Sequence, residues 1–318
     1  MNDSAEVILR TNKIPSKLPY IWNKAKRMKM LYIMLIIPVA YQIIFHYIPM
    51  YGIIIAFKDY RYIDGFLGSK WNNFEHFTNL FTSEYFWRVL LNTVNISVLR
   101  IITSFPAPIL FALLLNEIGN LKIKKITQTI SYLPHFMSWV VLAGIVQELF
   151  SPQRGIVNYI LTVLGHEPIY FLTSTDFFVP ILLISGIWQG VGWGSILYLA
   201  SLTSIDPELY QSAEIDGANR FQKAIYISLP ALVPVISILF LLNLSGLMNA
   251  GFDQIFNLYN PLVYKVSDIL DTYVYRMGIQ DGRYDFSTAV GLFKNIIGCT
   301  LLVSSNALLK KFNDYGIW

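Results

Sequence analysis

The chain has 318 residues, of which 54% are apolar and only 14% are charged, and its mean hydropathy is +0.48. Soluble domains carry about a quarter charged residues, so this composition indicates a protein of the lipid bilayer. The single cysteine, Cys299, excludes an intrachain disulfide and a cysteine-based redox or zinc motif. The four histidines have no metal-binding spacing, so no catalytic or metal site is expected.

Six stretches are long and apolar enough to cross the ~30 Å hydrocarbon core of a membrane as helices. They are residues 30–57, 85–118, 126–149, 177–203, 230–251 and 287–309. The first span follows a polar, basic segment and lacks a small-residue cleavage site, so we expect it to remain in the membrane. The sequence therefore predicts an all-α, polytopic membrane protein, with a basic N-terminal segment at 1–29 and one transmembrane domain at 30–318.

Prolines should bend two of these stretches. The second stretch would be about 50 Å long as a straight helix, which is too long for one upright span and too short for two. We therefore expect one tilted helix that bends near Phe105–Pro108, because proline removes a backbone donor. Pro134 should kink the third stretch in the same way.

The basic residues predict the orientation. The presumed inside segments hold about twice as many Lys and Arg residues as the presumed outside loops, which favours a cytoplasmic location for both termini. The outside loops, at about 58–84, 150–176 and 252–286, are long enough to form short surface helices.

The inside loop at about 204–229 contains a short helix with clear boundary signals. Asp206 can cap free backbone N–H groups, and Pro207 suits the first helical turn. Gly217 is a natural stop because glycine accepts a left-handed backbone. A second helical stretch is expected at 219–228. Taken alone, such a helix is typical of an interfacial cap on a membrane protein.

The residues of this loop nevertheless resemble a known motif. The segment Tyr210-Gln-Ser-Ala-Glu-Ile-Asp-Gly-Ala218, with Ile227 and Leu229-Pro230 after it, is similar to the EAA motif of binding-protein-dependent ABC permeases. Other segments resemble the LplB-like sugar permease branch of the maltose-permease-type superfamily. They are Tyr47-Ile-Pro-Met-Tyr-Gly, Phe105-Pro-Ala-Pro, Leu133-Pro-His-Phe-Met-Ser-Trp and Tyr315-Gly-Ile-Trp318. The likeness covers nearly the whole chain.

This resemblance implies the fold of a type I ABC importer permease in the bacterial cytoplasmic membrane, and a carbohydrate cargo, most simply an oligosaccharide. The implied partners are a second homologous permease subunit, two ATP-binding subunits and an extracytoplasmic sugar-binding protein or lipoprotein. Membrane lipid and the carbohydrate complete the contacts, and no nucleic acid is expected. The chain has no phosphate-binding loop, so ATP and Mg are expected on the partner ATPase, and this chain is not expected to be an enzyme.

The resemblance also assigns the residues that would dock the ATPase. They are Tyr210, Gln211, Ser212, Ala213, Glu214, Asp216, Gly217 and Ala218. The motif departs from the family pattern, because Gln211 replaces the usual glutamate and Ser212 the first alanine. Gln211 cannot form a charged pair with a basic group of the ATPase. Glu214, Asp216 or the second permease could carry that role instead.

Substrate contacts are expected mainly on the two spans that flank this loop, as in maltose-type relatives. The candidates are Trp188, Gln189 and Trp193 in the fourth span, Asn243, Ser245 and Asn249 in the fifth, and Arg100 in the second. Aromatic faces and amides bind sugars, but helix packing and interhelical hydrogen bonds would account for the same residues. Gly186, Gly190 and Gly194 recur every four residues and predict a packing ridge.

Basic side chains within the spans leave two interpretations open. Arg100 lies deepest, and such a charge either faces a transport pathway or forms a structural ion pair. Lys294 lies nearer the end of its span, where the structural interpretation is favoured.

Three alternative functions follow from other patterns. An ion-coupled secondary transporter would need paired acids within the spans, and an intramembrane enzyme would need a convergent catalytic set; neither pattern is visible. An ABC permease for another solute, such as glycerol phosphate or a polyamine, remains open. A phosphate cargo should leave several cations in the cavity, and Arg100 is the one good candidate.

Overall fold

The computed structural model describes the backbone of residues 28–313 and the side chains of residues 28–307. Contacts within the chain divide it into two units, one ending at Ile54 and the other beginning at Ile55. The predicted basic segment at 1–29 lies almost entirely outside the described residues.

The first unit is one helical run. It comprises α2 (Lys29–Gln42), the π-helical turn η1 (Ile43–Tyr47) and most of the 3₁₀ segment η2 (Ile48–Phe57). Pro38 lies inside α2 without ending it. The residues from Lys29 to Phe57 are long and apolar enough to cross a membrane, as the sequence predicts.

The second unit opens with a small hairpin. Strand β1 (Lys58–Asp59) pairs antiparallel with β2 (Lys70–Trp71), and α3 (Gly65–Gly68) lies in the loop between them. The amine of Lys58 donates to the carbonyl of Phe66 at 2.7 Å, which closes this loop. Helix α4 (Glu75–Thr82) follows and buries Leu80.

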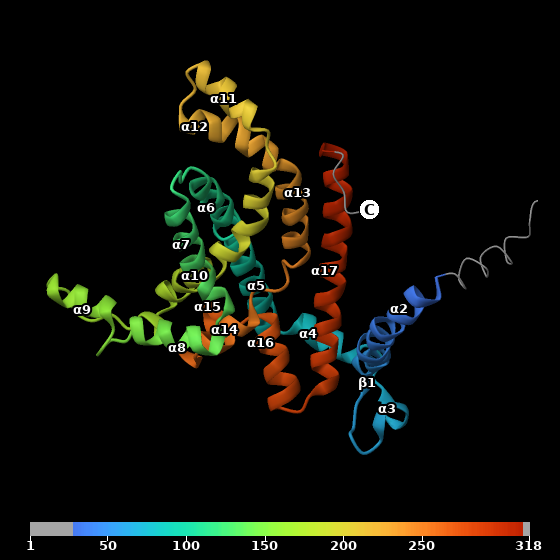
Figure 1. The fold of residues 1–318 in the computed structure, drawn as a ribbon. Coiled ribbons are helices and arrows are strands. Elements are labelled where there is room, and N and C mark those ends of the chain that lie inside the picture. The colour runs from blue at the N-terminus through green and yellow to red at the C-terminus, as the bar shows by residue number, and fades with distance from the viewer. Residues whose placement is uncertain (1–27, 314–318) are drawn as a thin grey trace, which may run out of the picture. The chain divides into compact units, whose positions relative to one another are not determined.

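Four further runs in residues 55–313 are long and apolar enough to span a membrane (Figure 1). They are α5 (Glu84–Thr103) with α6 (Pro106–Asn116), α10 (Thr175–Thr203), α12 (Arg220–Lys223) with η5 (Ala224–Ser228) and α13 (Leu229–Ser245), and α17 (Tyr284–Asn313). These runs confirm four more of the predicted spans. The second span is interrupted at Ser104 and Phe105, directly before Pro106, as expected.

The third predicted span is broken into two helical parts. Helix α7 (Leu121–Tyr132) and the 3₁₀ turn η3 (Leu133–Phe136) are followed by α8 (Trp139–Leu149), and the two parts meet at 105°. The backbone is extended at Met137 and Ser138, and Ser138 starts α8 as its N-cap. The bend predicted at Pro134 is therefore present but is a break of the helix rather than a kink, because a new helix begins at Trp139, five residues later.

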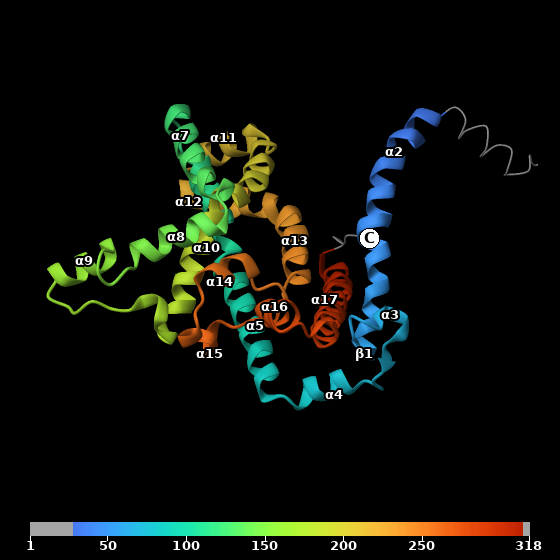
Figure 2. The same ribbon diagram turned by 90° about the horizontal axis from the view of Figure 1, so that it is seen from below.

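The outer segments also differ from the expectation of surface helices. Helix α9 (Ile156–Val163) and the turn η4 (Phe171–Thr173) fit it in part. The segment after the fifth span does not. It contains α14 (Phe252–Leu258), η6 (Pro261–Val263), α15 (Tyr264–Ser267), α16 (Leu270–Tyr275) and η7 (Arg276–Gln280). Ile255, Ile269 and Leu270 are fully buried, because this segment packs against α5, α8, α10 and α17 (Figure 2).

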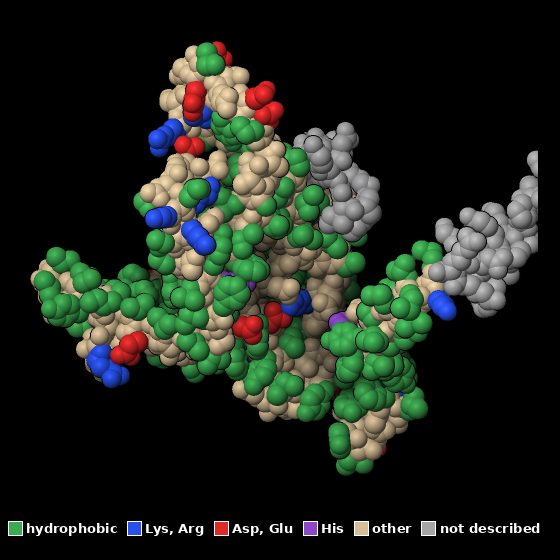
Figure 3. Space-filling view, viewed as in Figure 1, with side chains coloured by type: hydrophobic (Ala, Val, Ile, Leu, Met, Phe, Trp, Pro, Cys, Tyr) green, Lys and Arg blue, Asp and Glu red, His purple; other side chains and the backbone are tan. Residues whose placement is uncertain are grey.

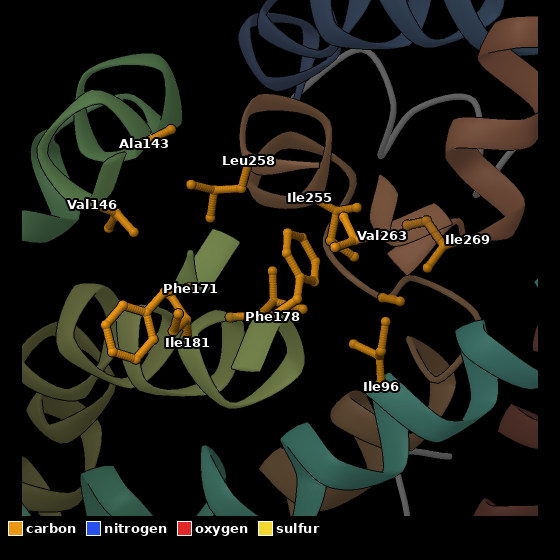
Figure 4. Packing of buried hydrophobic residues seen from close by; sticks show 12 residues of the cluster. Ile96, Ala143, Val146, Phe171, Phe178, Ile181, Ile255, Leu258, Val263 and Ile269 are labelled. Carbon is orange, nitrogen blue, oxygen red and sulfur yellow. The ribbon is translucent and has the colours of Figure 1, made fainter. Parts of the chain in front are cut away.

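Apolar clusters hold the second unit together. One joins Ile96 of α5 to α8, α10 and α14 through Val146, Phe178 and Ile255 (Figure 4). A second joins α4, α5, α16 and α17, and a third joins α6, α10 and α13. Helix α10 belongs to the first and third clusters and α5 to the first and second, so these two spans link the three clusters.

Candidate functional site

The loop at 204–229 folds as two short helices with a turn between them. Asp206 precedes α11 (Pro207–Ile215), and its carboxylate accepts a hydrogen bond from the Glu208 N–H at 2.9 Å. Asn219 and Gln222 form a reciprocal capping box at the start of α12, with both bonds at 2.8–2.9 Å. These caps confirm the predicted start signal and the second helical stretch.

Gly217 ends α11 as the sequence predicts. Its φ is +81°, the left-handed region that only glycine enters at little cost. The N–H of Ala218 donates to the carbonyl oxygen of Ala213 at 2.8 Å. The N–H of Gly217 donates to the carbonyl oxygen of Glu214 at 3.1 Å. This is the Schellman pattern, which satisfies the last carbonyls of the helix.

Side chains tie the two short helices to each other and to the next span. The hydroxyls of Tyr210 and Ser228 are 2.9 Å apart, and Glu214 pairs with the amine of Lys223 at 2.5 Å. The hydrogen bond and the charge of Lys223 lower the pKa of Glu214 below its ordinary value. The loop is therefore held mainly by its own internal bonds, and a long ion pair of 3.9 Å between Arg220 and Glu117 connects it to the end of the second span.

One surface of this loop has no partner in residues 28–307 that would cover it. Gln211, Ser212 and Asp216 are exposed, and so are the large apolar side chains of Ile215 and Phe221, at 87% and 73%. Charged side chains gather at this end of the unit, around α11 and α12 (Figure 3). Exposed apolar side chains beside charges are typical of a protein–protein contact.

The second region of interest is a cavity of about 600 Å³ between α5, α6, α10 and α13. Four of the predicted substrate residues line it: Arg100, Trp193, Asn243 and Asn249. Ser97, Phe105 and Tyr198 also line it. The wall thus combines aromatic rings, amides, hydroxyls and one cation, which is the set of groups that binds a polar ring compound.

Arg100 is held by a chain of hydrogen bonds that crosses three elements. Its guanidinium donates to the side-chain oxygen of Gln254 in α14. The amide nitrogen of Gln254 donates in turn to the Leu182 carbonyl at 2.7 Å and to the Ser185 hydroxyl at 2.9 Å, both on α10. Arg100 forms no ion pair with any described residue, so the structural ion pair considered from the sequence is absent from residues 28–307.

Gly251 makes room for this guanidinium. Its φ is +88°, and an ideal Cβ there would lie 2.7 Å from both terminal nitrogens of Arg100. Any other residue would therefore strain the backbone and displace the arginine.

The indole of Trp193 stacks on the ring of His135. The two ring centroids are 4.6 Å apart, and the ring planes are 3° from parallel. Phe136 contacts the same indole edge-on at 5.5 Å. These contacts come from η3, so the turn that breaks the third span also fixes the orientation of a cavity-lining tryptophan.

The other predicted substrate residues do not line this cavity. Trp188 and Gln189 are absent from its wall, and the hydroxyl of Ser245 bonds to its own helix at the Leu242 carbonyl, 2.7 Å away. Asn249 lines the cavity but does not belong to the helix of the fifth span. Helix α13 ends at Ser245, and Asn249 lies in a turn closed by its N–H to the Gly246 carbonyl at 2.7 Å. The predicted end of that span at residue 251 is therefore too late.

Lys294 has a structural partner, as favoured from the sequence. Its amine pairs with the carboxylate of Asp271 in α16. The pair lines a second cavity of about 540 Å³, and Asn249 lines both cavities. The two spaces therefore adjoin along the bundle.

The predicted glycine ridge on α10 is only partly correct. An added Cβ at Gly190 would meet nothing within 4 Å, whereas one at Gly194 would lie 2.9 Å from Pro108. The closest approach is at Gly192, where a Cβ would lie 2.1 Å from the carbonyl oxygen of Ser131 in α7. The four-residue spacing missed Gly192 because the contact falls between the expected positions.

Sequence reasoning also missed Ser97 and Gln254. Ser97 precedes Arg100 by one helical turn, and this spacing could have identified it as a neighbour on the same face. Gln254 lies in a segment interpreted as an outside loop, and nothing in the sequence signals its contact with Arg100.

Comparisons with known proteins agree with this architecture. Residues 104–313 match the family described as binding-protein-dependent transport system inner membrane component. Protein LplB of Bacillus subtilis (strain 168) is 42% identical over 298 residues, covering 93% of this chain and 94% of that protein. The polygalacturonan/rhamnogalacturonan transport system permease protein YteP of the same organism is 41% identical over 295 residues, covering 93% of this chain and 92% of that protein.

A solved structure has the same fold. The crystal structure of a bacterial ABC transporter involved in the import of the acidic polysaccharide alginate contains a chain that matches with a TM-score of 0.86 and 40% identity. The match covers 92% of this chain and 99% of that one. A second structure shows the bacterial alginate ABC transporter in complex with an alginate pentasaccharide-bound periplasmic protein.

Proposed function

Because the chain belongs to the family of binding-protein-dependent transport system inner membrane components, we propose that it is the membrane-spanning subunit of an importer for oligosaccharides, driven by a separate ATPase. The observation that carries this proposal is the likeness over nine-tenths of the chain to permeases of polysaccharide transport systems. The cavity lined by Trp193, Asn243 and Asn249 supplies the aromatic face and the amides that a sugar ring requires.

The loop at 204–229 is the proposed contact with the ATPase. Its exposed surface carries the predicted docking residues Gln211, Ser212 and Asp216. Because Tyr210 bonds to Ser228 at the start of the fifth span, a push on α11 would pass to the helix that lines the cavity. The ATPase would in this way change the access of the cavity from one side of the membrane to the other.

The remaining partners are proposed from the same likeness. A second homologous permease would complete the wall of the cavity, two ATP-binding subunits would bind ATP and Mg, and an extracytoplasmic binding protein would deliver the sugar. The similar alginate transporter forms a complex with a sugar-bound periplasmic protein, which supports a partner of this kind. Both termini are proposed to lie in the cytoplasm, on the side of the coupling loop.

Uptake into proteoliposomes tests this function. The chain is reconstituted with its second permease and ATPase, the binding protein is added outside, and entry of a labelled oligosaccharide is followed with and without ATP inside. Uptake should require ATP and the binding protein. Uptake driven by a proton or sodium gradient alone would contradict the ABC mechanism.

A further inference from the structure

Arg100 is a cation on the cavity wall whose charge is not balanced by a carboxylate of the described chain. Its hydrogen-bond acceptor is the neutral amide of Gln254, and its Nε has no partner in residues 28–307. By contrast, Arg276 bonds to Asp268 at 2.6 Å, and Lys294 pairs with Asp271. A charge that is removed from water without a counter-ion costs free energy, and within a membrane it marks a functional site.

Ser97 lies one helical turn before Arg100 and lines the same cavity. It is only 4% exposed, and its hydroxyl has no hydrogen-bond partner in residues 28–307. Ser185 and Ser195, on the neighbouring helix α10, bond to their own backbone at 2.6 Å. Ser97 therefore offers a buried donor one helical turn from a half-buried cation, and both groups belong to one face of α5.

The rest of the cavity contains no charge that would oppose an anion. None of the residues that line it is Asp or Glu, and Arg100 is the one cation among them. The adjoining cavity holds Asp271 and Lys294 as a bonded pair, so its net charge is zero. The positive potential of this part of the pathway is therefore centred on Arg100.

We propose that Arg100 and Ser97 form an anion subsite of the cavity, and that the cargo is an oligosaccharide whose sugar units carry carboxylates, that is, uronic acids. This inference rests on the proposed function as a carbohydrate importer. The free N–H groups of the guanidinium would donate to the sugar carboxylate, and the Ser97 hydroxyl would add a further bond. Hydrogen bonds of this charge-assisted kind are about twice as strong as neutral ones.

The arrangement suits passage as well as binding. A transport site must hold its cargo firmly enough for entry and weakly enough for release. Gln254 already occupies one N–H group of Arg100, and the cavity offers a single cation, so a carboxylate would be held at one point rather than enclosed. Successive carboxylates of a chain could then pass this point one after another.

Two probes that differ only in charge test this subsite. Uptake of tri-galacturonate is compared with uptake of its carboxyl-reduced counterpart, tri-galactose, by the complete reconstituted complex, with wild type and Arg100→Met. Both proteins use the same binding protein, so its own preference cancels in the ratio of variant to wild type. Tri-galacturonate uptake should fall on the order of tenfold or more. Tri-galactose uptake should change by less than about twofold, because its hydroxyl forms only a neutral bond.

Arg88→Met is the matched control, because Arg88 lies on the same helix but is exposed near its outer end. It should leave the uptake of both sugars unchanged. Ser97→Ala tests the subsite without removing a charge, and it remains informative if Arg100→Met does not assemble. It should lower tri-galacturonate uptake roughly two- to tenfold and leave tri-galactose uptake less affected.

The possible failures are distinguishable. An equal loss of both sugars in Arg100→Met would assign a structural role to Arg100, and unchanged tri-galacturonate uptake in Ser97→Ala would remove Ser97 from the subsite. Either result overturns the inference while sugar import stands. If wild type takes up neither sugar with ATP but moves a phosphate ester or a polyamine, the proposed carbohydrate function itself is overturned.

Discussion

The loop at 204–229 and the cavity wall around Arg100 have different proposed roles, contact with the ATPase and contact with the sugar, and they are built from different kinds of contact. In the loop, bonds join residues close in the chain, such as Asp206 to Glu208 and Glu214 to Lys223. In the wall, Arg100 on α5 bonds to Gln254, 154 positions away, and Gln254 bonds back to α10. The loop is thus stabilised locally, whereas the wall exists only when α5, α10 and α14 are packed together.

This difference predicts which properties a substitution in each region should change. A change in the loop should weaken a local turn and its contact with the ATPase, while the bundle remains folded. A change in the wall or in the packing of α10 should alter both stability and cargo handling, because the same contacts support both. Pairs of similar substitutions, one in the loop and one in the wall, can separate a local weakening from a combined loss of stability and cargo handling.

The largest effect is expected where α10 approaches α7. In Gly192→Ala, the new Cβ would lie 2.1 Å from the Ser131 carbonyl oxygen, so two backbones must separate. We expect a loss of about 3 kcal/mol or more, seen as a lower melting temperature and poor assembly in detergent. Gly190→Ala, two residues earlier on the same helix, meets open space and should be neutral or slightly stabilising. Similar melting temperatures for the two variants would contradict this packing.

A second pair compares the loop and the wall directly. Gly217 and Gly251 both have a left-handed backbone, with φ of +81° and +88°, so alanine should cost about 1–2 kcal/mol of local strain at either position. Only Gly251→Ala would also collide with Arg100. The guanidinium can swing aside, so the protein should still fold, but sugar uptake should fall about tenfold if the position of Arg100 matters for transport.

Gly217→Ala is the matched control for that uptake measurement. It should change the coupling of ATP hydrolysis to transport rather than the apparent affinity for the sugar. A shift in apparent affinity in Gly217→Ala, or none in Gly251→Ala, would remove the proposed distinction between loop and wall.

The same distinction explains which features could be predicted from the sequence. The cap at Asp206, the stop at Gly217 and most of the spans depend on neighbouring residues and hydropathy, and the structure has them where expected. The right-angle break before Trp139 depends on the extended backbone at Ser138, and proline spacing alone does not reveal its size.

The cavity wall was only partly predictable for the same reason. Arg100 stands out because a deep charge is costly, and Trp193 and Asn243 because they are polar or aromatic within a span. Their convergence with Asn249, Ser97 and Gln254 results from packing between segments far apart in the sequence. Trp188 and Ser245 looked equally suitable by residue type, but neither lines this wall, because residue type alone does not reveal which way each side chain faces.

A third prediction concerns the start of the coupling helix. Asp206→Ala removes the acceptor for the Glu208 N–H, and the loss of an N-cap costs about 1 kcal/mol. Hydrogen exchange in α11 should accelerate roughly fivefold, while the melting temperature of the bundle stays the same. Glu208→Gln is the control, because it removes the same unit of negative charge from the helix start but keeps the cap. A drop in the global melting temperature with Asp206→Ala would show that the loop is not an independent local unit.

The smallest expected effect decides which acid of the loop is available to the ATPase. Glu214 already pairs with Lys223, and that partner lowers its pKa, so its carboxylate is charged but engaged within the loop. Asp216 is exposed and forms none of the ion pairs found in residues 28–307. With Gln211 neutral, Asp216 is the one of these two acids that is free to meet a basic group of the ATPase. Asp216→Asn should therefore reduce coupled ATPase activity about two- to fivefold, the range of an exposed ion pair.

Glu214→Gln is the matched change, because it removes the same charge from the same loop. It should affect coupling less than Asp216→Asn does, since what it breaks is the internal bond to Lys223. The effect of Asp216→Asn should also shrink as salt rises, because exposed charges are screened over about 10 Å at 0.1 M salt. The reverse order, with Glu214→Gln the more damaging, would mean that the Glu214–Lys223 pair opens on docking, and the loop would then be a flexible contact rather than a rigid one.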